Sequence, residues 1–123
     1  MTGRIFLGLS ALIWLPFGLY CLFVPGYLAA AAGVSFATPT GATDIRATYG
    51  GLTAAIGALA LLGALRPGVS RNALLLLATA CAGLGGARLI GVALDGHVTA
   101  WTAQALVLEL GTAAFGAWRL RRA

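Results

Sequence analysis

The amino-acid sequence predicts an all-α fold, a four-helix transmembrane bundle whose successive helices run up, down, up and down across a bilayer. Hydrophobic residues make up 60% of the 123 residues and charged residues only 9%, whereas soluble domains carry about 25% charged residues. So few charges could not cover the surface of a soluble fold, so lipid is the expected solvent. The apolar residues also fall into separate runs of about 20 residues, the length that crosses a bilayer core as a helix. Residues 1–123 therefore form a single integral membrane domain.

The first predicted helix covers residues 5–24 and contains Pro16, which membrane helices tolerate. A Pro-Gly pair ends it and begins a longer connection to the second helix. Within this connection, residues 27–32 are expected to form one or two turns at the membrane interface, and Gly33 is placed to end them. An alternative is that the first run, followed by four alanines, is a cleaved secretory signal peptide, which would leave three helices.

The other three predicted helices cover residues 45–65, 72–94 and 99–120. Thr43 or Asp44 can cap the second helix by accepting hydrogen bonds from its free N–H groups. Small residues recur four positions apart on the second and third helices, a pattern that lets helix backbones approach closely in lipid. The residues expected to pack helices together are Gly50, Gly51, Ala54, Ala82 and Gly86.

The arginines predict the orientation of this bundle. Only two of them, Arg46 and Arg88, lie near one side of the predicted topology. The other side carries Arg4, Arg66, Arg71, Arg119, Arg121 and Arg122. Because positive residues remain on the cytoplasmic side, both termini are expected in the cytoplasm, with the protein in a bacterial inner membrane. The net charge of +5 does not indicate a nucleic-acid partner, since no basic face is visible.

The remaining polar residues gather near the opposite side. A tight turn at Asp95 makes the third and fourth helices antiparallel neighbours. Arg88 would lie about 9 Å from the outer end of its helix and Glu109 about 15 Å, so a long guanidinium side chain can bridge them. Charges within a membrane are expensive and generally paired, so they indicate a functional site by default. The predicted polar cluster comprises Arg46, Tyr49, Arg88, Asp95 and Glu109, with Asp44 and Gln104 in secondary positions.

Each of these residues also has a structural interpretation. The pair of Arg88 and Glu109 can be a clasp that fixes helix register, Asp44 a helix cap, and Arg46 a side chain that reaches for the outer surface. His97 stands alone in a short loop, so no metal site is expected. The two cysteines are expected to be small buried hydrophobes. No cofactor motif and no nucleophile with a neighbouring base is visible.

Three stretches resemble the motifs of a bacterial family known as domain of unknown function 4345. The stretch from Asp44 to Leu52 resembles its first motif, Arg88 to Gly96 its second, and Glu109 to Gly111 its third. The resemblance covers nearly the whole chain. It implies a four-helix integral membrane protein similar in layout to DoxX-like proteins, and it implies no activity.

Three functions are compatible with these features. The polar cluster, open to the outer leaflet, can bind a lipid-like or other small amphipathic ligand, for which a lipid headgroup or a quinone-like carbonyl is suitable. Alternatively, the chain is a structural accessory subunit that packs on a larger membrane complex or on copies of itself. A membrane enzyme that uses Glu109 as an acid or base is the third hypothesis.

Overall fold

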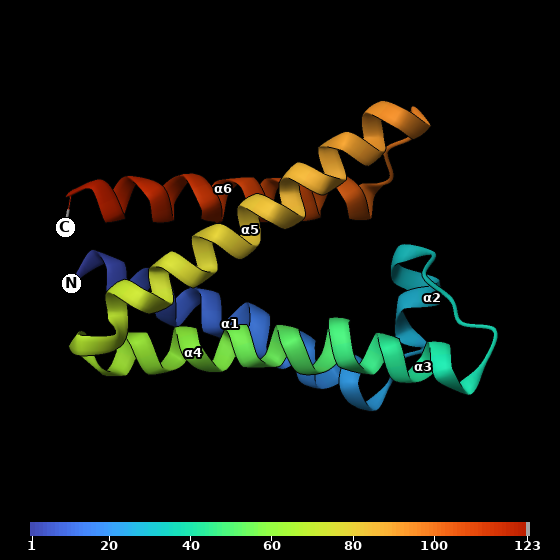
Figure 1. Cartoon of the computed structure of the whole chain (residues 1–123), viewed down its shortest axis with the longest axis horizontal. Helices are drawn as coiled ribbons and strands as arrows, with labels where there is room; N and C mark the ends of the chain where they lie inside the picture. Colours follow the sequence, from blue (N-terminus) through green and yellow to red (C-terminus); the bar gives the residue numbers. More distant parts are fainter. Residues whose placement is uncertain (123) are drawn as a thin grey trace.

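The structure, a computed structural model, describes residues 1–122, and within that range every regular element is a helix. This confirms the predicted all-α class. In chain order (Figure 1) the elements are α1 (Thr2–Phe23), α2 (Tyr27–Ala32), α3 (Pro39–Ile45), the π-helix η1 (Arg46–Leu52), α4 (Thr53–Leu65), α5 (Pro67–Asp95) and α6 (Ala100–Arg122).

The helix that contains α4 begins earlier than predicted. The side chain of Thr38 accepts a hydrogen bond of 3.2 Å from the backbone N–H of Gly41, and Pro39 occupies the first helical position. Proline suits this position because its fixed φ is helical and its missing N–H would have no partner there. The predicted cap at Thr43 or Asp44 is therefore wrong, and both residues lie inside the helical segment.

The connection between α1 and α3 is shorter than predicted, but the short helix expected within it is present. It contains the short helix α2, which ends at Gly33 with a left-handed φ of 69°. Gly96 ends α5 in the same way, with a φ of 66°. Both positions favour glycine because a side chain is strained at positive φ. The six residues left between the predicted helices 45–65 and 72–94 are mostly helical, since α5 already begins at Pro67.

The segments α3, η1 and α4 form one continuous helical rod, Pro39–Leu65, of 27 residues. Its middle part is a seven-residue π-helix, a rare conformation that occurs frequently at functional sites. The hydroxyl of Thr53 donates to the carbonyl of Thr48 five residues earlier, over 3.2 Å. The hydroxyl of Thr48 donates to the carbonyl of Asp44 over 2.8 Å.

Successive long helices run in alternating directions, and both chain ends lie at the same end of the molecule (Figure 1). The rod packs along α1, α5 crosses obliquely from the end of α4, and α6 returns along α5. Three helical segments are long and apolar enough to cross a membrane: Thr2–Phe23, Pro39–Leu65 and Pro67–Asp95. This is the pattern of a membrane protein.

Close packing between α1 and the rod depends on three glycines. A Cβ added to Gly50 would lie 2.7 Å from Cα of Leu22, and Cβ atoms at Gly18 and Gly57 would collide with the backbones of Ala54 and Leu15. The small residues Gly50 and Ala54 therefore lie where the two backbones meet. The absence of side-chain bulk here allows a helix contact of the kind that stabilises membrane bundles.

The other small residues predicted to pack lie differently. A Cβ on Gly51 would meet only the carbonyl of Arg46, at 3.7 Å, and one on Gly86 would meet nothing within 4 Å. Ala82 is exposed. On α5, the residue that meets α6 closely is Gly85, whose added Cβ would lie 2.7 Å from Cδ2 of Leu110. Within residues 1–122, Ala82 and Gly86 therefore do not make the close contact between α5 and α6, which Gly85 makes instead.

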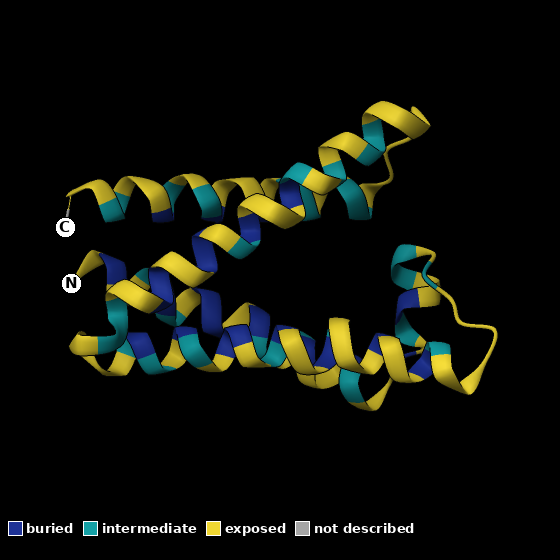
Figure 2. Cartoon of the chain, viewed as in Figure 1, coloured by how far each residue is buried: buried dark blue, intermediate teal, exposed yellow. Residues whose placement is uncertain are grey.

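Buried residues occur on several helices (dark blue in Figure 2), and their side chains form two clusters. The larger lies between α1, α4 and the first part of α5 and includes Leu7, Trp14 and Leu77. The smaller joins Cys21, Leu28 and Ile45, with Trp101 packed against it. Large apolar side chains such as Leu12 (72% exposed) and Ile90 (63% exposed) cover much of the outer surface. Lipid would remove this surface from water.

Candidate functional site

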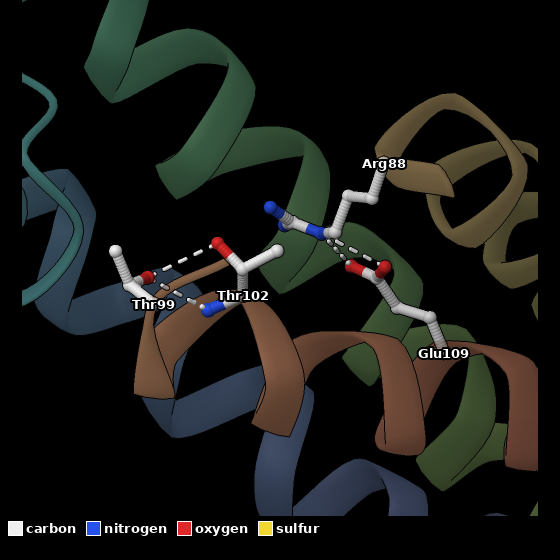
Figure 3. A network of polar contacts seen from close by, with 4 residues as sticks. All are labelled: Arg88, Thr99, Thr102 and Glu109. Atoms are coloured by element: carbon white, nitrogen blue, oxygen red, sulfur yellow. Dashed lines mark hydrogen bonds and ion pairs between the residues drawn. The ribbon is translucent and has the colours of Figure 1, made fainter. Parts of the chain in front are cut away.

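An ion pair between α5 and α6 is the centre of the candidate site (Figure 3). Nε of Arg88 donates to both carboxylate oxygens of Glu109, at 3.0 Å and 2.9 Å. Glu109 is only 4% exposed. The pairing expected from the tight turn at Asp95 and from the depths of the two residues is therefore present in the structure.

Gly85, one turn before Arg88, lets the two helices approach at this level. A Cβ on Gly85 would lie 3.4 Å from Cβ of Glu109, so its absence leaves room for the acidic side chain against α5. A buried carboxylate is tolerated only with a partner, because removing an ion from water costs several kcal/mol. The guanidinium of Arg88 supplies that partner.

Arg88 uses only one of its three nitrogens in this pair. The two terminal nitrogens carry four N–H groups, and they have no acceptor among residues 1–122. Figure 3 shows them directed away from the carboxylate of Glu109. The Arg88 side chain is 27% exposed, so these donors remain accessible.

A partly open cavity of about 640 Å³ lies beside the pair, between α1, η1, α4, α5 and α6. It separates the two buried clusters, since Trp14 and Ile56 belong to one and Phe17, Tyr49 and Trp101 pack against the other. Most of its lining is apolar. The lining residues are Ile13, Trp14, Phe17, Thr48, Tyr49, Leu52, Thr53, Ile56, Ala80, Leu84, Arg88, Trp101, Gln104, Ala105, Leu108 and Glu109.

The predicted polar residues are thus only partly brought together. Tyr49 and Gln104 line the cavity with the ion pair. Arg46 lies elsewhere, and its Nε donates to the carbonyl of Leu22 over 3.2 Å near the end of α1. Asp44 and Asp95 are exposed, and neither lines the cavity.

Sequence reasoning missed the aromatic part of the lining. Trp14, Phe17 and Trp101 stand in apolar runs, where rings are ordinarily core or interface residues. The rings of Phe17 and Trp101 lie 6.0 Å apart between centroids. Trp14 also has a buried indole N–H without an acceptor in the described part of the chain. In the sequence, the indole N–H of Trp14, a polar group within an apolar helix, was the only sign that this residue could belong to a site.

No group of three or more His, Cys, Asp or Glu side chains within residues 1–122 could hold a metal ion. The geometry instead offers hydrogen-bond donors at one side of an apolar cavity. A cavity of this size with few polar groups has the dimensions of a small-molecule site.

An all-α chain with three membrane-length apolar helices, a buried ion pair between helices and an adjoining cavity is a membrane protein with an internal polar site. The chain matches the family described as Domain of unknown function (DUF4345) over residues 2–120, and it belongs to that family. The resemblance seen in the three motifs is thereby confirmed. No curated protein and no solved structure matches the chain.

Proposed function

We propose that this chain is a four-helix, up-down-up-down protein of the bacterial inner membrane that binds one small amphipathic molecule in the cavity beside Arg88 and Glu109. In this arrangement α6 is the fourth membrane-spanning helix. Gln104 and Glu109 make α6 less apolar than the other three, and both line the cavity. Polar groups directed into a bundle are tolerated within a membrane. The cavity would open toward the outer leaflet.

The observation that carries this proposal is that the two terminal nitrogens of the Arg88 guanidinium are unused. A clasp between two helices would be strongest with two parallel N–H···O bonds from a guanidinium to a carboxylate. Here Nε alone serves Glu109, and the terminal nitrogens stay accessible beside the cavity. Their four N–H groups can donate to oxygen atoms of a bound molecule.

The charges favour a neutral polar head on that molecule. Arg88 and Glu109 are the only lining residues with a formal charge, and they neutralise each other. An anionic head would leave one negative charge without compensation in an apolar cavity, which is unfavourable. A carbonyl oxygen, as in a quinone-like ring or a lipid ester, accepts hydrogen bonds without adding charge. The aromatic and aliphatic lining suits a ring or a chain attached to such a head.

The cavity can be tested by filling it. Ala105→Phe places a ring in the cavity, whereas Ala103→Phe adds the same ring to an exposed position of the same helix outside the lining. Native mass spectrometry of the detergent-purified protein would measure binding of a monoacylglycerol and of the fatty acid with the same chain. Wild type and Ala103→Phe are expected to bind the neutral lipid, and Ala105→Phe to lose it by about tenfold or more.

Thermal unfolding of both variants separates lost binding from lost folding. Equal binding by Ala105→Phe and Ala103→Phe would contradict the proposal, because the cavity would then have no role. Tighter binding of the fatty acid than of the monoacylglycerol would contradict the preference for a neutral head.

An accessory subunit is the second candidate, and one observation favours it. Gly83, Gly86 and Gly91 on α5 have nothing within 4 Å of an added Cβ, so no helix within residues 1–122 packs on α5 at these positions. Small residues of this kind allow close contact with another membrane helix. Co-purification of a larger partner at fixed stoichiometry, lost in Gly86→Leu, would support this function.

A further inference from the structure

Helix ends from distant parts of the sequence meet at the end of the molecule that holds both termini (Figure 1). Arg4, in the first turn of α1, donates from Nε to the carbonyl of Ala64 over 2.7 Å and from Nη2 to that of Leu65 over 3.3 Å. Arg119, near the end of α6, lies against Gly3, where an added Cβ would be 3.5 Å from its Nε. Two guanidinium groups therefore flank the first turn of α1.

This end has no acidic residue to balance its arginines. The chain contains three acidic residues and eight basic ones. Asp44 and Asp95 lie near the other ends of the rod and of α5, and Glu109 lies ten residues before Arg119, or about 15 Å along α6. The single ion pair within residues 1–122 is the one between Arg88 and Glu109. Within residues 1–122, the positive charges at the terminal end thus have no acidic side chain as a counter-ion.

Arg119 shows the clearest sign of a missing partner. Its Nε is buried and has no acceptor among the described residues. Buried N–H groups nearly always have an acceptor, and an unpaired one that carries positive charge indicates a bound oxygen or anion. This guanidinium lies against Gly3, where an added Cβ would be at ordinary contact distance, 3.5 Å from Nε and 3.7 Å from Nη2. Arg119 therefore lies where the first turn of α1 meets the end of α6.

The neighbouring aromatic ring places this end at the level of lipid headgroups. Trp118 is 43% exposed, and the guanidinium carbons of Arg119 and Arg122 lie 5.8 Å and 4.8 Å from its ring centroid. Tryptophan rings gather at the boundary between membrane and water. The anion present at that depth is the phosphate of a phospholipid. Basic pockets between membrane helices on the cytoplasmic side bind such headgroups.

We propose that the end formed by Arg4, Arg119, Trp118 and Arg122 binds the phosphate of an anionic phospholipid. Guanidinium groups recognise phosphate oxygens with paired, charge-assisted hydrogen bonds. Arg119 and Arg122 of α6 would donate hydrogen bonds to the phosphate oxygens. Arg4 would keep its two bonds to carbonyl groups at the end of α4. This site is separate from the cavity and does not depend on the proposed ligand there.

Native mass spectrometry of the full chain can test this site with phosphatidylglycerol and phosphatidylcholine of identical acyl chains. Wild type is expected to retain phosphatidylglycerol preferentially. Arg119→Gln is expected to reduce that retention by about tenfold, the effect of one charge-assisted contact. Arg71→Gln is the control, because it removes one exposed positive charge near the same end without any contact to Trp118. It is expected to change retention by less than about twofold.

Arg122→Gln is a second test variant in case Arg119→Gln fails to fold. Because Arg122 is exposed, its substitution should not disturb folding. It is expected to weaken retention more than Arg71→Gln does. Equal effects of all arginine variants would overturn the proposal, because charge alone would then explain binding. Equal retention of the two lipids would overturn it as well. Displacement of the lipid by millimolar inorganic phosphate would show that free phosphate is the ligand and that the lipid assignment is wrong.

Discussion

Arg88 and Glu109 are the residues whose pairing could be predicted from the sequence. The helix rise and a tight turn at Asp95 fix how far each residue lies from the end of its helix, and these two distances placed the side chains at similar depth. The aromatic lining could not be predicted in this way. Whether Trp14 or Phe17 faces a cavity or lipid depends on the rotation of α1 about its axis. The sequence does not reveal that rotation, because α1 carries apolar residues on all of its faces.

The ion pair leads to a prediction about single and double variants. Arg88→Met would leave the buried carboxylate of Glu109 without its partner, at a cost of about 3–5 kcal/mol in unfolding free energy. Glu109→Leu is expected to cost less, because the Arg88 side chain can still reach the cavity. The double variant should recover much of the stability, since no orphan charge remains.

Unfolding in detergent, followed by circular dichroism, gives the stability of all four proteins in this cycle. Additive losses would show that the two side chains do not interact. A stable double variant that still binds a monoacylglycerol would identify the pair as a structural clasp. A stable double variant that has lost binding would agree with the proposed ligand site.

At the scale of the elements, helix existence was predictable and the π-helix was not. Each apolar run gave one long helix because its length and composition require internally satisfied backbone groups in lipid. A π-helix depends on tertiary contact instead. In η1 the close approach of Gly50 to α1 and the bond from Thr53 to Thr48 accompany the wider turn. Neither has a local sequence signature strong enough to predict it.

Gly50 and Gly51 allow a matched test of helix packing. A methyl group on Gly50 would lie 2.7 Å from Cα of Leu22, so Gly50→Ala must separate α1 from the rod. We expect it to lower the unfolding free energy by about 1–3 kcal/mol, as overpacking does. Gly51→Ala meets only the Arg46 carbonyl, at 3.7 Å. It should be neutral or stabilising by up to about 1 kcal/mol, because alanine favours helices.

Thermal melts of the two variants in the same detergent measure this difference. Equal stability of Gly50→Ala and Gly51→Ala would mean that α1 and the rod are farther apart in the membrane than in the structure. Leu59→Ile, a volume-conserving change at a half-buried position, provides a further control and should cost less than about 1.5 kcal/mol.

At the scale of the whole molecule, the arginines and the polar site lie toward opposite ends. The arginine-rich end carries both termini and the turn between α4 and α5. The cavity, the ion pair and the π-helix lie farther along the helices, toward the connection that contains α2. The arginine-rich end therefore has the positive charge expected of a protein surface that contacts anionic lipid. The polar site lies toward the opposite end of the molecule.

This separation predicts the topology of the chain in a bacterial inner membrane. Reporter fusions after Met1 and after Arg122 are expected to read cytoplasmic, because six arginines remain on that side: Arg4, Arg66, Arg71, Arg119, Arg121 and Arg122. A fusion near Thr40, in the connection that precedes the rod, is expected to read periplasmic. The carboxyl-terminal fusion tests whether α6 crosses the membrane, since its composition is less apolar than that of the other three segments.

A periplasmic reading at Arg122 with the other two readings unchanged would mean that α6 does not span the bilayer. Glu109 would then have another route to water, and the physical reason for its pairing with Arg88 would disappear. Loss of the first segment by intact mass would instead support the signal-peptide alternative. Simultaneous substitution of Arg119, Arg121 and Arg122 by glutamine should weaken the preference for cytoplasmic termini, because positive residues close to the helix ends determine orientation.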